Sequence, residues 1–133
     1  MGFKLQIVTP DGSKFDGEID SLIVKTDEGD VEILRGHTDY FAALGPGKAK
    51  LRSGTESRLA SSSGGFISVY KGEVRLVTTT FEFADEIDLA RANAAKENAE
   101  RAIASAKDEK SLAILKAKLA RALSRISVKE SSR

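Results

Sequence analysis

The sequence predicts an α+β protein, in which an N-terminal antiparallel β-sandwich is followed by a C-terminal antiparallel hairpin of two helices. Up to about residue 84, apolar residues alternate with polar ones and Gly recurs at short intervals, whereas the rest of the chain is rich in Ala, Leu, Lys, Glu and Arg and contains no Gly or Pro. The side-chain period thus passes from about 2 to about 3.6, the difference between a strand and a helix. We therefore divide the 133 residues into a sandwich domain (1–84) and a helical domain (85–133).

The first domain is predicted to consist of short strands joined by turns. Strands are expected at residues 3–9, 14–16, 21–26, 31–34, 40–44, 48–52, 56–61, 65–70 and 73–80. Turn-forming sequences such as Pro10-Asp11-Gly12 separate them, and Lys71-Gly72 has the length of a two-residue hairpin loop. Ser63-Gly64-Gly65 is interpreted as a turn or bulge that only Gly fits. Many short strands at this spacing are typical of an antiparallel sandwich or barrel.

Two helices are predicted in the second domain. The first, residues 87–105, has a narrow stripe of small residues, and a polar segment at 106–110 is the expected turn. The second helix presents one apolar face, formed by Leu112, Leu115, Leu119, Ala122 and Ile126. The short connection implies an antiparallel pair. Because both apolar stripes are narrow, the hairpin should be marginal alone and available for other contacts.

The start of the first helix has two interpretations. Asp85 is expected to cap the helix, which places Asp88 in its first turn, near unpaired N–H groups and the positive end of the helix dipole. Asp88 and Arg91 are three residues apart, so they can form an ion pair on one face. The same residues can instead belong to a site that holds an anion.

Charge is distributed unevenly along the chain. Residues 1–87 contain 10 Lys and Arg and 14 Asp and Glu, whereas residues 88–133 contain 11 and 6. Lys118, Arg121 and Arg125 share one face of the second helix, and no acid occurs between Lys116 and Glu130. This basic face is either a solvated surface or a contact for an acidic protein surface, a phosphate-bearing ligand or nucleic acid.

The sequence contains no recognisable catalytic constellation. It has no phosphate-binding loop of the G-x-x-x-x-G-K-[ST] type, no H-E-x-x-H motif and no nucleophile elbow. With no Cys and a single His, His37, a thiol or histidine metal site is not expected, and Asp27, Glu28 and Asp30 lack the spacing of a calcium loop. No apolar run approaches the ~18 residues that a membrane-spanning helix needs. We therefore expect a non-catalytic protein that requires no metal or cofactor and does not insert into a membrane.

Four segments occur in an order that is specific in combination. They are Val8-Thr9-Pro10-Asp11-Gly12, Glu28-Gly29-Asp30-Val31-Glu32-Ile33-Leu34-Arg35-Gly36-His37, Ser63-Gly64-Gly65-Phe66-Ile67-Ser68-Val69 and Ile87-Asp88-Leu89-Ala90-Arg91-Ala92. Together with the alanine-rich hairpin, they resemble the epsilon subunit of bacterial F-type ATP synthases over nearly the whole chain. The resemblance implies a non-catalytic subunit of the central stalk, peripheral at the cytoplasmic face of the cell membrane.

The resemblance also implies partners within the synthase complex. The sandwich would rest on the gamma subunit and on the polar loops of the membrane c-ring, through Glu28, Gly29, Asp30 and the neighbouring Gly-His turn at His37. The helices would either fold down on the sandwich or extend towards the alpha and beta subunits, and the extended form would block rotation in the hydrolysis direction. Contact with an acidic stretch of beta is implied for Lys118, Arg121 and Arg125.

Some bacterial members of this family bind ATP as a regulatory ligand in the folded-down form. Their motif is Ile/Leu-Asp-x-x-Arg-Ala, and the matching residues here are Ile87, Asp88, Arg91 and Ala92, with Arg121 and Arg125 on the second helix. Asn98 stands where such members carry a further Arg, which removes one charge-assisted contact.

Two other functions remain open from the residues alone. A nucleic-acid-binding module would use the basic second helix, but the scarcity of aromatic residues and the acidic first half argue against it. An adaptor that links two proteins outside any synthase would use the two domains as separate contact surfaces.

Overall fold

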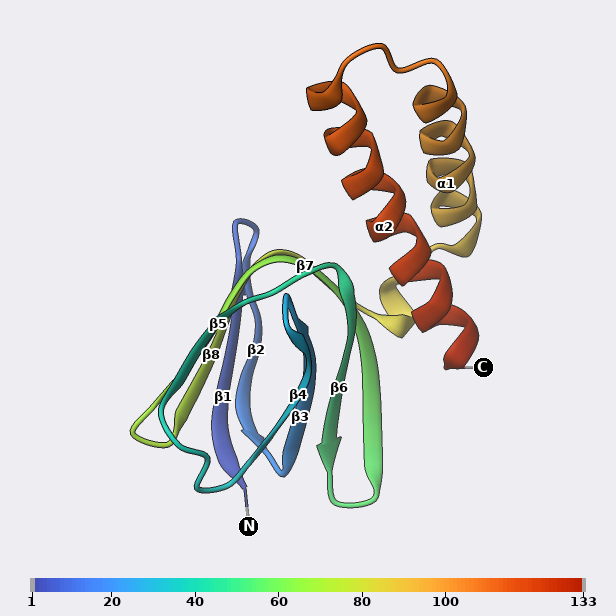
Figure 1. Cartoon of the computed structure of the whole chain (residues 1–133). Coiled ribbons are helices and arrows are strands. Elements are labelled where there is room, and N and C mark those ends of the chain that lie inside the picture. The colour runs from blue at the N-terminus through green and yellow to red at the C-terminus, as the bar shows by residue number, and fades with distance from the viewer. Residues whose placement is uncertain (1, 133) are drawn as a thin grey trace.

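The computed structural model describes residues 2–132, which form eight strands, one 3₁₀ turn and two α-helices (Figure 1). The strands are β1 (Phe3–Thr9), β2 (Gly12–Ile19), β3 (Ser21–Thr26), β4 (Gly29–Leu34), β5 (Tyr40–Ala43), β6 (Gly47–Ser53), β7 (Glu56–Tyr70) and β8 (Glu73–Phe83). The turn η1 (Ala84–Glu86) leads to α1 (Leu89–Ala104) and α2 (Glu109–Ser131). The predicted fold, a β-sandwich followed by a helical hairpin, is confirmed.

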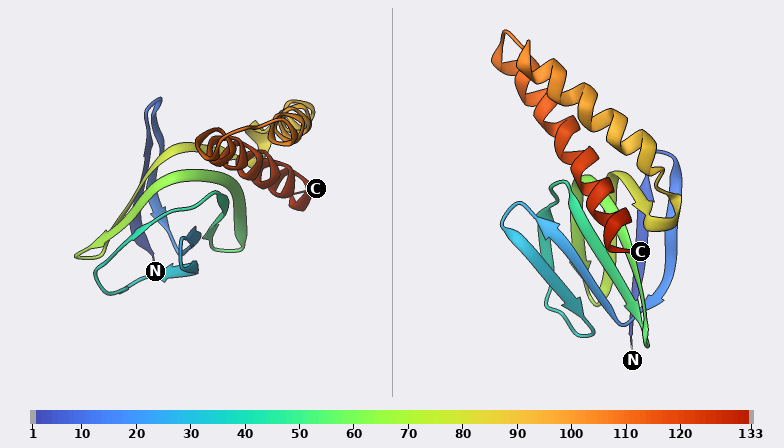
Figure 2. Two further views of the ribbon diagram at one scale, coloured as in Figure 1. Left: turned by 45° about the horizontal axis from the view of Figure 1, so that its top comes forward. Right: turned by 90° about the vertical axis from the view of Figure 1, so that its right-hand side faces the viewer.

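The strands form one hydrogen-bonded sheet that folds over on itself into two layers (Figures 1 and 2). Its order is β2-β1-β8-β7-β6-β3-β4, and β5 pairs with the second half of β7. Neighbouring strands run antiparallel except β1 and β8, which are parallel. The alternating sequence pattern cannot reveal that parallel pair, because alternation sets the faces of a strand and not the direction of its neighbour.

The longest strand, β7, replaces two strands that the sequence predicted at 56–61 and 65–70. Gly64 and Gly65, between them, have φ of 63° and 107°, and the strand continues through them without a break. A Cβ atom built on Gly65 would lie 1.9 Å from the carbonyl oxygen of Val77 on β8. The prediction that only Gly fits is therefore confirmed at Gly65, where the close approach of β8 is the physical reason, whereas the predicted turn or bulge is wrong.

The hydrophobic core lies between the two layers of the sandwich. Its largest fully buried side chains are Leu5, Ile7, Leu22, Val24, Ile33, Ile67, Leu76 and Phe81. The core cluster draws its residues from Phe3 to Phe83 and takes none from the helices. Burial of this apolar area is the main favourable term in folding, so the sandwich has the core that an independent domain needs.

The two helices begin at aspartate caps. Asp88 is the N-cap of α1, and its Oδ1 accepts a hydrogen bond from the backbone N–H of Arg91 at 3.1 Å. Asp108 caps α2 in the same way, accepting from the N–H of Ser111 at 2.7 Å, and this hydrogen bond lowers the pKa of the Asp108 carboxyl. Such caps typically contribute about 1 kcal/mol to helix stability.

The predicted cap at Asp85 is wrong, and the helix starts later than expected. Asp85 lies in η1, where the Glu86 side chain accepts the backbone N–H of Phe83 at 2.9 Å and closes a separate turn. The backbone is then extended at Ile87 and Asp88, so Asp88 becomes the cap. Because its carboxylate faces the end of the helix, the expected ion pair between Asp88 and the Arg91 guanidinium is not formed among residues 2–132.

The helical hairpin packs against the sandwich through α2. Figures 1 and 2 show α2 between α1 and the sheet, with the turn that joins the helices pointing away from the sandwich. The buried helical residues are small or medium-sized, namely Ala92 and Ala99 of α1 and Ala122, Ser124 and Val128 of α2. The structure thus has the folded-down arrangement, with close helix packing that small residues permit.

Substitution of Gly65 by Ala should destabilise the sandwich strongly, because the new methyl group would clash with Val77 and the residue would keep a positive φ. We expect a loss of about 2 to 5 kcal/mol in the free energy of unfolding, measured by urea denaturation. Gly12 is the matched control, since its φ is 117° but a Cβ atom added there would have no neighbouring atom within 4 Å. Gly12→Ala should cost only the conformational term of about 1–2 kcal/mol. Equal losses for the two variants would contradict the clash.

Candidate functional site

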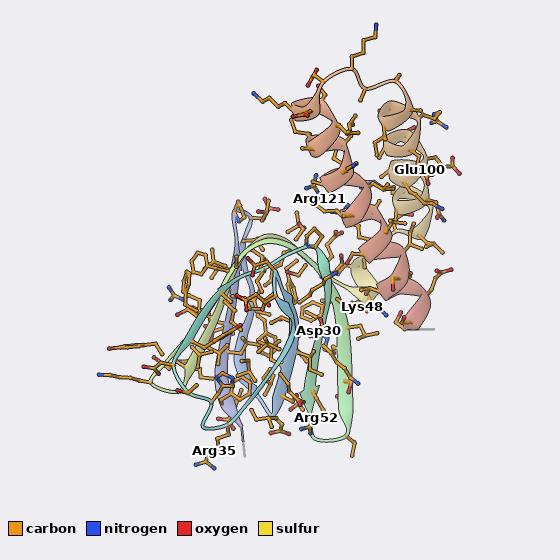
Figure 3. All side chains as sticks on the ribbon, viewed as in Figure 1. Asp30, Arg35, Lys48, Arg52, Glu100 and Arg121 are labelled. Carbon is orange, nitrogen blue, oxygen red and sulfur yellow. The ribbon has the colours of Figure 1, made fainter. Side chains whose placement is uncertain are left out.

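The C-terminal half of α2 is held by a transverse row of three side chains on the sandwich. Lys48 of β6, Ser61 of β7 and Glu82 of β8 are register partners on adjacent strands, so their side chains emerge side by side on one face. We call these three residues the docking row. Figure 3 shows Lys48 near the C-terminal end of α2. The row lies outside the core cluster, on the face that α2 covers.

Each member of the docking row contacts one α2 residue. The Ser61 and Ser124 hydroxyls are hydrogen-bonded at 2.9 Å and buried, and the Lys48 ammonium donates to the Ser131 hydroxyl at 3.1 Å. The third contact is an ion pair in which Arg125 Nε donates to the Glu82 carboxylate. A fourth contact lies beside the row, where the Lys129 ammonium donates to the Ala84 carbonyl at 3.0 Å. These polar contacts accompany the buried side chains of Ala122 and Val128 on the same helix.

These contacts are individually weak. The side chains of Arg125 and Glu82 keep 27% and 32% of their surface exposed, so solvent screens their attraction. Ion pairs of this kind contribute about 0–1 kcal/mol, and a neutral hydrogen bond contributes about 0.5–1.5 kcal/mol. The core cluster of the sandwich contains no residue of this interface.

Four of the six residues predicted to bind ATP lie together. Asp88, Arg91, Ala92 and Arg125 line a cleft of about 190 Å³ where α1, α2 and the end of β8 meet. Glu82, Glu86 and Ala95 complete its lining. Ile87 does not line this cleft, because its side chain is buried, with only 4% of its surface exposed. The residues that the sequence grouped by motif are thus grouped in space around the helix start.

Arg121, the sixth residue, lines a neighbouring groove instead. This groove, of about 500 Å³, runs between α1 and α2, and Arg121 shares it with Lys118 and Asn98. Arg125 and Ala95 line both spaces, so the cleft and the groove adjoin. The cleft alone is below the ~300 Å³ of a typical small-molecule site, whereas cleft and groove together are large enough. Asn98 accepts a hydrogen bond from Arg101, which satisfies its carbonyl oxygen within α1.

The residues predicted to face the c-ring are not all adjacent. Glu28 lies in the β3–β4 turn and Asp30 at the start of β4, where the Thr26 hydroxyl holds the turn by donating to the Gly29 carbonyl at 2.7 Å. His37 follows the other end of β4, about six residues of strand or roughly 20 Å away. The expectation that the Gly-His turn lies beside the acidic turn is therefore wrong. Figure 3 shows this separation, with Asp30 on the side of α2 and Arg35 at the opposite end.

His37 has a structural environment. Its Nδ1 lies 2.7 Å from the carbonyl oxygen of Thr38, and its ring contacts Tyr40 edge-on, with centroids 5.7 Å apart. Within residues 2–132 there is no group of three His, Cys, Asp or Glu side chains that could hold a metal ion. No helix in this part of the chain is long and apolar enough to cross a bilayer.

An exposed aromatic patch was not anticipated from the sequence. Phe41 of β5 keeps 69% of its surface exposed, and its ring lies 5.1 Å from that of Phe66 on β7. Val77 of β8 is the register partner of both Phe66 and Val8 of β1, which extends the patch across the sheet. The sequence feature that could have predicted this patch is the presence of consecutive apolar residues within strands, such as Phe66-Ile67 and Leu76-Val77. Consecutive residues of a strand point to opposite faces, so both faces carry apolar side chains.

Comparisons with known proteins agree with this architecture over nearly the whole chain. The family model "ATP synthase, Delta/Epsilon chain, beta-sandwich domain" matches residues 2–84, and the model "ATP synthase, Delta/Epsilon chain, long alpha-helix domain" matches residues 85–130. A curated ATP synthase epsilon chain from Ruminococcus albus is 38% identical over 127 residues, which is 95% of both chains. One from Bacillus velezensis is 36% identical over 125 residues, 94% of this chain and 95% of the relative.

Two solved structures share the fold. A chain in the cryo-EM structure of the Euglena gracilis mitochondrial ATP synthase has a TM-score of 0.76 and 25% identity, covering 96% of this chain and 79% of its own. A chain from the Tetrahymena thermophila mitochondrial ATP synthase has a TM-score of 0.65 at 17% identity, covering 97% and 94%. Sandwich, hairpin and sequence therefore agree, and the chain belongs to the ATP synthase delta/epsilon chain family.

Proposed function

We propose that this chain is a non-catalytic subunit of the central stalk of a bacterial F-type ATP synthase, and that its hairpin inhibits ATP hydrolysis when α2 leaves the sandwich. The bacterial relatives that match 94–95% of this chain are ATP synthase epsilon chains. The observation that carries the inhibitory part is the docked interface, which combines a basic helix with weak polar contacts. The subunit would act at the cytoplasmic face of the membrane, as a peripheral part of the complex.

Release of α2 would expose a cationic surface. Arg125 would lose Glu82 as its partner, and Lys118 and Arg121 already lie beside it on the helix. Like charges at steps of three and four residues reinforce one another's field, which attracts an acidic surface on another subunit. Such a surface on the beta subunit would hold the extended hairpin and stop rotation. The docked and extended forms then compete for the same basic residues.

The aromatic patch of Phe41, Phe66, Val77 and Val8 is the surface that we assign to the gamma subunit. An exposed apolar cluster of this kind on a soluble domain usually marks a protein contact. The acidic turn at Glu28, Gly29 and Asp30 is a separate polar surface, which we assign to the c-ring. Two contacts on different parts of the sandwich would fix the domain to the rotor while the hairpin moves.

ATP is proposed as a ligand of the docked form. It would span the cleft at Asp88, Arg91 and Ala92 and the groove at Arg121, with Arg125 between them. Since the cleft joins Glu82 of β8 to Arg125 of α2, bound ATP would favour the docked hairpin by mass action. The carboxylates of Glu82 and Glu86 oppose a polyphosphate in the cleft, so Arg125 would turn from Glu82 to the ligand.

A disulfide across the docked interface should abolish inhibition. The chain has no Cys, and the Ser61 and Ser124 hydroxyls are 2.9 Å apart, so the variant Ser61→Cys with Ser124→Cys can form a single bond between sandwich and helix. ATP hydrolysis by the reconstituted complex should be faster with the oxidised variant than with the same variant after reduction. The reduced protein is the matched control for both substitutions. Equal rates in the two redox states would contradict the proposal that α2 must leave the sandwich to inhibit.

ATP binding can be measured on the isolated chain by titration calorimetry. We expect binding by the parent chain and, for Arg91→Ala, an affinity at least about tenfold weaker, because one charge-assisted contact is worth about 1.5–3 kcal/mol. Lys107→Ala is the matched control, since it removes a positive charge at the exposed hairpin turn and should leave the affinity unchanged. Absence of heat at millimolar ATP would show that Asp88 and Arg91 serve only to start α1.

Removal of the Phe41 ring should weaken binding to the gamma subunit without loss of stability. A central aromatic residue of an interface commonly contributes about 2 kcal/mol or more, so we expect the affinity of Phe41→Ala to fall at least about tenfold. Leu34→Ala is the control, because Leu34 is also an exposed apolar residue, at 47%, but lies on β4. Equal affinities of the parent and Phe41→Ala for gamma would refute the assignment of this patch.

A further inference from the structure

A second cavity, of about 700 Å³, lies between the sandwich and a face of α2 different from the one that borders the nucleotide cleft. Ala120, Leu123, Ser124 and Ser127 form its helical wall, whereas Arg125 belongs to the cleft. At about 100° per residue, these positions point to separate faces of the helix. The volume is within the range of about 300–1,000 Å³ found for small-molecule sites. Because one wall is α2, the cavity exists only while the hairpin is docked.

The sandwich wall of this cavity is cationic. Lys25 of β3 and Lys48 and Lys50 of β6 line it, against a single carboxylate, that of Asp30. None of the three lysines forms a salt bridge with a carboxylate of residues 2–132, and Lys48 donates only to the neutral Ser131 hydroxyl. Lys48 and Lys50 alternate along β6 and therefore share its outer face. The cavity thus has an excess of two positive charges.

A glycine positions the third lysine. A Cβ atom on Gly47 would lie 2.7 Å from Cδ of Lys25, so the Lys25 stem lies directly across the bare backbone of β6. This contact brings a β3 ammonium group to the same space as the two from β6. Three lysine side chains from two strands line this one space, and their positive charges can neutralise a doubly charged anion, which a solvated surface of mixed sign would not do.

The other residues that line the cavity indicate which chemical groups the ligand carries besides its negative charge. The Ser127 hydroxyl of α2 can donate to an anion oxygen, and Ile23, Leu59 and Leu123 supply an apolar surface. Leu123 keeps 45% of its surface exposed in the docked hairpin, so an apolar group placed against it would gain burial. A dianionic head and an apolar body are together the features of an organic phosphate monoester.

We propose that this cavity binds a small organic phosphate monoester and that the ligand holds the hairpin in its docked position. The phosphate contacts Lys25, Lys48 and Lys50, and the apolar body lies between Leu59 and Leu123. A ligand that binds only the docked form shifts the hairpin towards that form in proportion to its concentration over its Kd. The effect on ATP hydrolysis rests on the inhibitory role proposed above, whereas the binding itself does not.

The test is a titration of the full isolated chain with phenyl phosphate, followed by amide NMR. We expect saturable shifts at Ile23, Leu59 and Ser124, and weaker binding of inorganic phosphate, which lacks the apolar body. Lys25→Gln with Lys50→Gln should weaken phenyl phosphate binding about tenfold or more, because two charge-assisted contacts are lost. Lys107→Gln with Lys110→Gln makes the same change of charge at exposed positions in the hairpin turn and the first turn of α2, and should bind as the parent does.

Two further variants separate this site from its alternatives. Asp88→Ala with Arg91→Ala alters the nucleotide cleft and should leave phenyl phosphate binding intact. The oxidised Ser61→Cys, Ser124→Cys protein, fixed in the docked form, should bind at least as tightly as its reduced form. The proposal is overturned if the double lysine variant binds like the parent or if the shifts centre on Asp88 and Arg91. Because Ser124 itself lines the cavity, the disulfide variant is compared only with its own reduced form, and binding by the reduced form but not by the oxidised form would also overturn the proposal.

Discussion

The close pairing of β7 with β8 is the constraint on which the other features depend. At Gly65 the two backbones approach so closely that a Cβ atom would overlap the Val77 carbonyl oxygen. The long ribbon that results supplies Ile67, Leu76 and Phe81 to the core and joins the two layers of the sandwich. It also ends directly at η1 and α1, so its register decides where the hairpin begins.

The same register creates the surface on which α2 rests. Ser61 and Glu82 are partners across the ribbon, and they bind consecutive residues of α2, Ser124 and Arg125. Register partners on the ribbon therefore contact consecutive residues of a helix of 23 residues, beside the contact of Lys129 with Ala84 and the buried Ala122 and Val128. The hairpin hydrogen bonds and ion pair are weak one by one, whereas the core beneath them is apolar and independent of the helices. Docking of the hairpin and integrity of the sandwich core thus depend on different residues.

The sequence revealed the order of the two domains because a change of period from strand to helix is local information. It misplaced the first helix cap, since Asp85 and Asp88 have equal cap chemistry and only the Glu86 turn distinguishes them. It split β7 in two, because Gly64-Gly65 resembles a turn when the neighbouring strand is unknown. The docking row could not be predicted from the sequence, because its members are far apart in the chain and meet only through strand register. Asp88, Arg91 and Ala92, by contrast, were expected to lie together and do so, because they follow one another at one helix start; that they bind ATP stays a prediction.

The location of the docking row outside the core has a consequence for how such a protein can diversify. A substitution at Lys48 or Glu82 removes a contact between the sandwich and α2 but removes no side chain from the core cluster. In the mechanism proposed above, such substitutions would adjust the fraction of time that the hairpin spends undocked, at little cost to folding of the sandwich. Organisms with different needs to conserve ATP could then retain one scaffold and differ in this equilibrium alone.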